Sequence, residues 1–274
     1  MRHWTQDDIP WHRFDPSKVD PDILKIVKAA SLVEKNGDDY AVYLCNVFSD
    51  DPEFQGAARA WALEEVQHGD VLGRWAELAD SGFRFDAAFK TFTDGYKLPL
   101  DATKSVRGSR AGELVARCIV EVGTSSYYTA LGNAAQEPVL KAICQRIAAD
   151  ELRHYKLFYE NLRGYLAKED LTQWQRLKVA LGRIAESEDD ELAYAYYAAN
   201  GDGAPYDRAH YAREYMLRAF AYYRPAVIDR GVAMTLKAIG LKPRGWLQRV
   251  VSKLAWKLVA FRQRRNLAVA AAGI

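Results

Sequence analysis

Two short motifs, each a glutamate followed three residues later by a histidine, constrain this chain more than any other feature. They are Glu65/His68 and Glu151/His154. On an α-helix, residues three apart lie on the same face, so each pair can direct a carboxylate and an imidazole at one metal ion. The chain has only 5 histidines, so fewer than one such pair is expected by chance. The duplicated motif therefore predicts two helices that face a common metal site.

Two further glutamates lie upstream of these motifs at matching distances. Glu34 precedes Glu65 by 31 residues and Glu121 precedes Glu151 by 30, and each distance fits one antiparallel helical hairpin. Four carboxylates and two imidazoles form the ligand inventory of di-iron and di-manganese carboxylate bundles. Oxygen donors with one histidine per metal favour iron or manganese over zinc. The predicted metal ligands are Glu34, Glu65, His68, Glu121, Glu151 and His154.

The alternative is that these acids are solvated surface charges and that both histidines are structural. Four carboxylates on inward faces would be very costly without cations, which favours a metal site for the duplicated set. The upstream glutamates also have competitors, because Asp38 lies one turn after Glu34 and Glu113 two turns before Glu121. Side-chain reach favours Glu34 and Glu121.

Each motif is preceded by a second acid, Glu64 in the first and Asp150 in the second. A metal-bound histidine usually donates its other N–H to a carboxylate. We predict that Asp150 accepts from His68 and that Glu64 accepts from His154. Alternatively, both acids are surface residues that pair with Arg153 or Arg74.

The fold class follows from periodicity. Apolar residues recur at helical spacing along nearly the whole chain, and alternating β-type runs are absent, so we expect an all-α protein. The segment 81–107 has weak periodicity and is expected to be the long crossover of a ferritin-like four-helix bundle. Helices are predicted at 21–48, 53–80, 109–135, 138–167, 171–187, 190–200, 207–239 and 245–266.

Charge is distributed unevenly along the chain. The formal net charge is +2, but residues 230–274 contain ten basic and no acidic residues, so the remainder carries 28 − 36 = −8. We expect three parts: the bundle with an N-terminal arm (1–170), additional helices packed on it (171–240), and a basic amphipathic C-terminal helix (241–274). That helix has an apolar stripe of Leu247, Val250, Val251, Leu254, Leu258 and Phe261.

The basic helix leaves three alternatives open. It can lie on an anionic membrane as a peripheral contact, dock an acidic acyl carrier protein, or pack on the bundle with its basic residues outward. The three cysteines form no Cys-x-x-Cys motif, which indicates neither a disulfide framework nor a zinc ribbon and favours a reducing compartment. With no signal-peptide pattern or long apolar segment, a cytoplasmic protein is expected, with peripheral contact at the inner face of the membrane as the alternative.

Two segments resemble a known family. The run Trp61-Ala-Leu-Glu-Glu-Val-Gln-His-Gly-Asp-Val-Leu72 is similar to Trp-x-x-Glu-Glu-Asn-Arg-His-Gly-Asp-Leu-Leu of the soluble acyl-acyl-carrier-protein desaturases. The run Ile143-Cys-Gln-Arg-Ile-Ala-Ala-Asp-Glu-Leu-Arg-His154 resembles their Ile-Cys-x-x-Ile-Ala-Ala-Asp-Glu-x-Arg-His. Alignment through Gly132 and Asn133 places the family's ligand on Thr124, whereas a shorter turn before the fourth helix places it on Glu121.

The resemblance implies an oxygen-activating centre of two iron ions, or manganese and iron, reduced by an external ferredoxin-like donor. It further implies a desaturase, hydroxylase or oxygenase acting on an acyl or lipid-like substrate, with an acyl carrier protein as a potential partner and a homodimer as a potential assembly. Thr124 is a candidate for proton delivery in catalysis, or else a helix hydroxyl bonded to its own backbone. The other functions considered are an iron-oxidising or peroxide-protective protein of the ferritin or rubrerythrin type, and a scaffold without metal.

Overall fold

The computed structural model describes residues 3–186, 190–201 and 203–272. All regular secondary structure in these ranges is helical, which confirms the all-α prediction. Three short 3₁₀ turns, Gln6–Asp8, Trp11–Arg13 and Pro16–Lys18, form an N-terminal arm. The helices are α1 (Pro21–Lys35), α2 (Gly37–Val47), α3 (Pro52–Ala79), α4 (Phe85–Gly95), α5 (Arg110–Ala134), α6 (Pro138–Leu166), α7 (Gln173–Glu186), α8 (Asp190–Asn200), α9 (Arg208–Ala221), α10 (Pro225–Ala238) and α11 (Trp246–Ala272).

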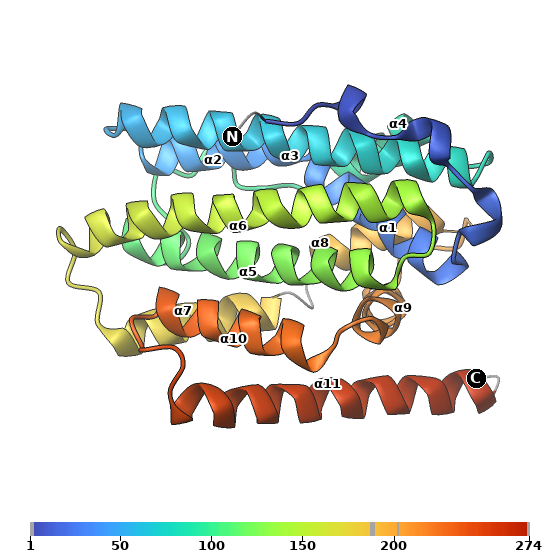
Figure 1. Ribbon diagram of the computed structural model, residues 1–274. Helices are drawn as coiled ribbons and strands as arrows, with labels where there is room; N and C mark the ends of the chain where they lie inside the picture. Colours follow the sequence, from blue (N-terminus) through green and yellow to red (C-terminus); the bar gives the residue numbers. More distant parts are fainter. Residues whose placement is uncertain (1–2, 187–189, 202, 273–274) are drawn as a thin grey trace.

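The helices are arranged in layers (Figure 1). One layer contains α3 with α1 and α2 packed against it, and the next contains the antiparallel pair α5 and α6, with α3 also contacting α6. Helices α7 and α10 pack on α5, and α8 packs on α1. The long helix α11 forms an outer layer whose main contacts are with α9 and α10 (Figure 1).

Helices α1, α3, α5 and α6 each follow a residue whose side chain accepts hydrogen bonds from the free backbone N–H groups of the first turn. The Asp51 carboxylate accepts from the backbone N–H of Phe54 at 2.9 Å, and Ser109 Oγ accepts from Gly112 at 2.9 Å. Asp20 and Glu137 cap α1 and α6 in the same manner. Such caps each stabilise a helix by roughly 1 kcal/mol, and the proline that follows each of the three acids lacks an N–H and fits the first helical position. Local sequence therefore sets where these helices start.

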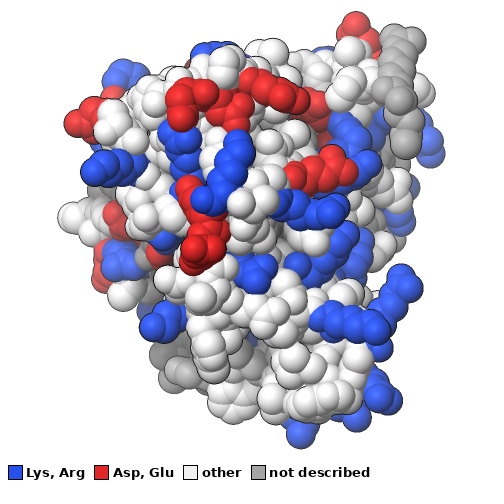
Figure 2. Space-filling model, turned by 90° about the vertical axis from the view of Figure 1, so that its left-hand side faces the viewer, with Lys and Arg blue, Asp and Glu red and all other residues white. Residues whose placement is uncertain are grey.

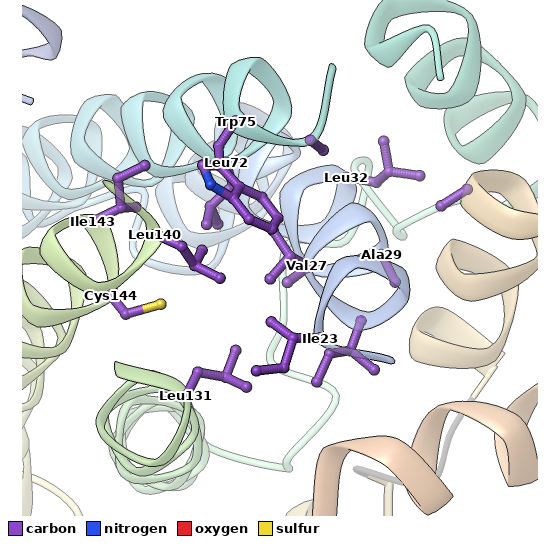
Figure 3. Close-up of a cluster of buried hydrophobic side chains, with 14 of the residues drawn as sticks. Ile23, Val27, Ala29, Leu32, Leu72, Trp75, Leu131, Leu140, Ile143 and Cys144 are labelled. Atoms are coloured by element: carbon purple, nitrogen blue, oxygen red, sulfur yellow. The ribbon is translucent and has the colours of Figure 1, made fainter. Parts of the chain in front are cut away.

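Two buried hydrophobic clusters hold the layers together. Side chains from α1, α3, α5 and α6 point toward one another in the first cluster (Figure 3), where Trp75 is fully buried and donates its indole N–H to Glu137 Oε2 at 2.8 Å. The second cluster involves the opposite ends of α3, α5 and α6 together with α2, α7 and α10. Burial of one large apolar side chain contributes about 1.5–3 kcal/mol, so these clusters are the main source of stability. Five of the six predicted ligands come from the stretches between them, and Glu121 comes from the edge of the second cluster.

The predicted helix 21–48 is divided by Asn36 into α1 and α2. A close approach of backbones accompanies this break. A Cβ atom on Gly37 would lie 2.7 Å from Glu65 Cβ, and one on Gly69 would lie 2.5 Å from the backbone nitrogen of Lys35. Glycine at both positions lets α1 and α2 approach α3 at the height of Glu65.

Two further helix predictions were incomplete. The segment 81–107 contains α4, whose buried Phe85, Ala88 and Phe92 recur at helical spacing that the weak overall periodicity concealed. The predicted helix 207–239 is broken before Pro225, which begins α10, because a proline disfavours helical backbone at the preceding residue. In the described ranges, no helix has the length and apolar character required to cross a membrane.

Candidate metal centre

Four helices contribute the six predicted ligands to one buried region. Glu34 comes from α1, and Glu121 from α5. The two Glu-x-x-His pairs come from α3 and α6, which pack against each other. All six side chains are buried, and the most exposed of them, Glu34, has 7% of its surface accessible. The hairpin spacing thus places all four carboxylates and both imidazoles in the interior.

One donor group surrounds the inner nitrogen of His68. His68 Nδ1 lies 3.3 Å from Glu151 Oε1, 3.4 Å from Glu65 Oε2 and 3.6 Å from Glu34 Oε2. One ligand atom from each of these four residues lies within 4.8 Å of the others. The geometry can hold a cation between Glu34, Glu65, His68 and Glu151.

A second donor group surrounds His154. His154 Nδ1 lies 3.0 Å from Glu65 Oε1, 3.7 Å from Glu121 Oε2 and 3.9 Å from Glu151 Oε2. Ligand atoms of these four residues also lie within 4.8 Å of one another. Glu65 and Glu151 belong to both groups, with one oxygen of each directed at either histidine. They have the geometry of carboxylates that bridge two ions.

Several ligand atoms lack any hydrogen-bond donor among the described residues. They are both oxygens of Glu121, Glu151 Oε1, and the Nδ1 atoms of His68 and His154. Unpaired buried polar atoms are costly, and native proteins rarely retain them without a ligand. Because these atoms face the carboxylate oxygens of the two donor groups, the residues fit a bound cation. The structure thus contains buried acidic and histidine clusters able to hold metal ions.

The competing carboxylates lie elsewhere. Asp38 is exposed. Glu113 is buried, but it accepts hydrogen bonds from the Tyr43 hydroxyl at 2.8 Å and the Ser105 hydroxyl at 2.7 Å. Neither residue belongs to a donor group, so the structure brings together Glu34 and Glu121 rather than their competitors.

The outer nitrogen of each histidine faces a carboxylate from the opposite motif. His68 Nε2 lies 3.0 Å from Asp150 Oδ2, and His154 Nε2 lies 3.1 Å from Glu64 Oε2. These are the pairings expected from the sequence. A histidine that donates through Nε2 presents the lone pair of Nδ1 to the carboxylate cluster, as a metal ligand must.

The alternative partner Arg153 is present as well. Its guanidinium donates to Glu64 Oε2 at 2.6 Å and also pairs with Asp150. Arg74 instead lies over the Trp11 ring, 4.2 Å from its centroid. Arg153 therefore holds the two acids that face the histidines, and the two interpretations of Glu64 and Asp150 are compatible.

Two aromatic side chains make hydrogen bonds at the site whose acceptors the sequence pattern did not specify. Trp4 of the N-terminal arm donates its indole N–H to Asp150 Oδ2 at 2.6 Å and stacks on His68, with ring centroids 6.0 Å apart. The Tyr128 hydroxyl donates to Glu34 Oε1 at 2.6 Å. Tyr128 lies two turns after Glu121 on α5, which was a usable signal, whereas Trp4 is 146 residues from Asp150 and no local pattern identifies it.

Comparison with known proteins gives no family for this chain. No family model matches it, and no curated protein matches it significantly. The similarity to acyl-acyl-carrier-protein desaturases accordingly rests on the two quoted runs and stays a prediction.

Thr124 lies next to the donor groups. Its hydroxyl donates to Glu151 Oε2 at 2.5 Å and is also within 3.3 Å of the backbone oxygen of Val120. Both expected uses of this hydroxyl, contact with the site and contact with its own helix, are therefore present. The carboxylate of Glu121, rather than Thr124, occupies the fourth position of the second donor group.

The charged groups shift one another's protonation. Burial and the charge of Glu65 raise the pKa of Glu34 well above its usual value, and burial and Glu151 do the same to Glu121. Burial acts in the opposite direction on His68, but the hydrogen bond to Asp150 and the adjacent carboxylate of Glu151 outweigh it and raise the His68 pKa well above normal. Protons therefore balance the carboxylates when no metal is bound, and metal binding would displace them.

A cavity of about 400 Å³ adjoins the donor groups. Glu34, Glu65, Glu121, Thr124 and Glu151 line its inner side. Its other walls are mainly apolar and come chiefly from α5, α9 and α10, with further residues from α1, α2, α3, α7, α8 and α11. The apolar residues include Tyr127, Met216, Phe220, Val227, Ile228 and Val232, and the charged residues Arg117, Arg183, Glu186 and Glu191 also line the cavity. The cavity thus joins a charged cluster to an apolar chamber.

Proposed function

We propose that this chain is a ferritin-like di-iron oxidoreductase that uses molecular oxygen to oxidise an apolar substrate. The observation that carries the proposal is that the two donor groups share Glu65 and Glu151, as two carboxylate-bridged ions require. The four ligand-bearing segments, α1 with α2, α3, α5 and α6, correspond to the ferritin-like bundle in this proposal. Iron is favoured by the oxygen-rich donor set, with manganese and iron together as the variant.

In this proposal, Glu34 and His68 would hold one ion, Glu121 and His154 would hold the other, and Glu65 and Glu151 would contribute a carboxylate oxygen to each. When bound, the metals would supply the capacity to reduce oxygen. The protein residues orient this centre: Asp150 and Glu64 accept the outer N–H groups of the two histidines, and Arg153 holds both acids. The Thr124 hydroxyl, hydrogen-bonded to Glu151 Oε2, is placed to transfer a proton at the cavity wall.

The substrate class is inferred from the cavity. Its mainly apolar walls can accept an alkyl chain, whereas an iron-storage protein has no need of such a chamber beside its metal site. Hydroxylation or desaturation of such a chain by one oxygen molecule consumes two electrons and two protons beyond those of the substrate. The proposal therefore includes an external electron donor of the ferredoxin type.

The first test is metal content and oxygen consumption after replacement of one bridging residue. Glu65→Ala or Glu151→Ala is expected to remove both iron ions and to abolish oxygen consumption by the reduced protein. Glu160→Ala, on the same helix as Glu151 but exposed and paired with Lys156, is the matched control and should retain both. Stoichiometric iron in either bridging variant would overturn the ligand assignment.

A second measurement separates substrate oxidation from iron storage. Reduced protein is mixed with oxygen in the presence and absence of a long-chain alkyl compound, and the product is analysed by mass spectrometry. An oxidised alkyl product supports the proposal. Accumulation of a ferric core in a large cage, with no alkyl product, would favour the ferritin-type alternative.

A further inference from the structure

Helix α11 directs polar side chains toward the body of the protein. Gln248 is buried and donates to Asp229 Oδ2 at 3.0 Å, and Ser252 donates to Asp229 Oδ1 at 2.6 Å. Further along, Gln263 donates to the backbone oxygen of Phe220 at 2.8 Å. The helix is thus attached to α9 and α10 largely by hydrogen bonds, with Val259 as its buried apolar residue.

The opposite face of α11 is apolar and exposed. Large apolar side chains occupy nearly every turn of this face, with accessible fractions of 70% for Trp246, 45% for Val250, 60% for Leu254, 55% for Leu258 and 59% for Phe261. We call these five residues the outer stripe. Of the stripe expected from the sequence, Leu247 and Val251 are half-buried and therefore lie outside the outer stripe. A surface helix normally buries its apolar face and exposes its polar one, so α11 has the reverse orientation.

Basic side chains lie beside the outer stripe. Arg249, Lys253, Lys257 and Arg264 are exposed on the same helix, and no acidic residue occurs between Asp229 and the last residue of the sequence. In Figure 2 the lower part of the molecule, where α11 begins, shows blue and white surface and no red atoms. The partner of this face must therefore be both apolar and anionic.

We propose that α11 docks this protein on an anionic lipid bilayer. The outer stripe would enter the boundary between head groups and acyl chains, while the flanking lysines and arginines contact lipid phosphates. A second copy of the chain is disfavoured because it would bring one basic helix against another. An acidic protein would match the charges, but an open convex row of Trp, Leu and Phe offers it no groove.

Helix α11 lies beside the cavity, and this position indicates where the substrate comes from. Ala255 of α11 and the exposed Ile184 of α7 line the cavity whose inner side carries Glu121 and Glu151. The docking helix is therefore part of the outer wall of that chamber. If the proposed function holds, this arrangement indicates that the substrate is an apolar lipid dissolved in the membrane. Such a lipid would enter the cavity beside α11.

The experiment is co-sedimentation of metal-free, full-length protein with vesicles. One set contains phosphatidylcholine with phosphatidylglycerol, and the other contains phosphatidylcholine alone. Wild-type protein should bind the anionic vesicles much more tightly, because each basic residue near an anionic surface strengthens binding by roughly fivefold. Raised salt should reduce this binding.

Two groups of variants test the two parts of the face. The triple variant Leu254→Ser, Leu258→Ser, Phe261→Ser removes the centre of the outer stripe, and Lys253→Glu with Lys257→Glu reverses the charge beside it. Both should lose most of the vesicle binding. The controls are Leu63→Ser and Lys156→Glu, equally exposed residues on α3 and α6, which should bind like wild type.

Three outcomes would overturn the membrane proposal. They are absence of binding to anionic vesicles, binding that the triple variant retains, and a dimer on a sizing column that the triple variant converts to monomer. If the protein bound an acidic acyl carrier protein but did not bind anionic vesicles, the membrane proposal would likewise be wrong. Because metal-free protein is used, failure of the di-iron proposal leaves this test unaffected, and failure here leaves the metal site standing.

Entry of lipid into the cavity has its own test. A fluorescent fatty acid in anionic vesicles should transfer to the protein, and Gly123→Leu should reduce the transfer without reducing vesicle binding. Gly123 lines the cavity, and a Cβ atom there meets no atom within 4 Å, so the larger side chain would occupy the chamber. Unchanged transfer in this variant would disprove the entry route.

Discussion

The two halves of the metal centre share one sequence pattern but differ in how their ligands are held. In the first half, Glu34 accepts a hydrogen bond from the buried Tyr128, and His68 lies between Asp150 and the ring of Trp4. In the second half, neither oxygen of Glu121 has a hydrogen-bond donor among the described residues. The two copies of the Glu and Glu-x-x-His pattern therefore form one half of the centre with fixed ligands and one half with less constrained ligands.

This difference shows how a repeated motif can acquire two roles. A ligand fixed by a phenol and an indole keeps its geometry, whereas a carboxylate with free oxygens can change its coordination. Next to Glu121, Gly123 has exposed surface although α5 is an interior helix, because it faces the cavity. We therefore expect oxygen and substrate to approach from the second half.

Among the changes that compare the two halves, the largest effect is expected for the two unshared glutamates. Glu34→Ala and Glu121→Ala should each leave about one metal ion per chain, because each belongs to only one donor group. Metal analysis of the purified variants checks this result. If either variant kept both ions or lost both, the division into two sites with two shared carboxylates would be wrong.

The next largest effect, a loss of metal affinity, is expected when the carboxylates that orient the histidines are replaced. Asp150→Asn is expected to weaken metal binding by roughly 10–100-fold, the range typical of such partners. Glu64→Gln should weaken it less, because Glu64 is more exposed, with 22% of its side chain accessible against 3% for Asp150. Competition with a chelator measures both affinities.

The control for this pair is Asp94→Asn, an exposed acid on α4 that pairs with Lys90. Its metal affinity should equal that of the wild type. A larger loss for Glu64→Gln than for Asp150→Asn would reverse the order of rigidity proposed for the two halves.

A smaller effect is expected from the hydroxyl that holds Glu34. Tyr128→Phe should destabilise the metal-free protein by about 1–2 kcal/mol, because a buried acceptor loses its donor. Thermal unfolding of the metal-free protein gives the value. Tyr159→Phe on α6, outside the donor groups, is the matched control, and equal losses in both variants would remove the special role of Tyr128.

The smallest effect is a gain in stability. Gly123→Ala should stabilise the protein by about 0.5–1 kcal/mol, since glycine inside a helix is less favourable than alanine. No atom lies within 4 Å of the added Cβ. Gly56→Ala on α3 is equally unhindered and should show a similar gain. A loss of stability at Gly123 alone would indicate that the second half of the site has a backbone constraint.

Much of the site was predictable because it depends on local spacing. Residues three apart on a helix share a face, and a hairpin of fixed length returns to the same height. Those two rules, together with side-chain reach, selected Glu34, Glu121 and both Glu-x-x-His pairs. The tendency of a metal-bound histidine to donate to a carboxylate then paired Asp150 with His68. Helix starts were equally accessible, because Asp20 and Asp51 cap their helices through neighbouring N–H groups.

What depends on distant contacts could not be obtained in this way. The helix break at Asn36, the position of Trp4 beside His68 and the cavity beside Glu121 all result from packing between segments remote in sequence. The orientation of α11 is the clearest case. Its sequence specified a basic amphipathic helix, but periodicity does not state which face the rest of the protein covers. In the folded structure, Gln248, Ser252 and Gln263 bond to the body of the protein, and the outer stripe is left exposed.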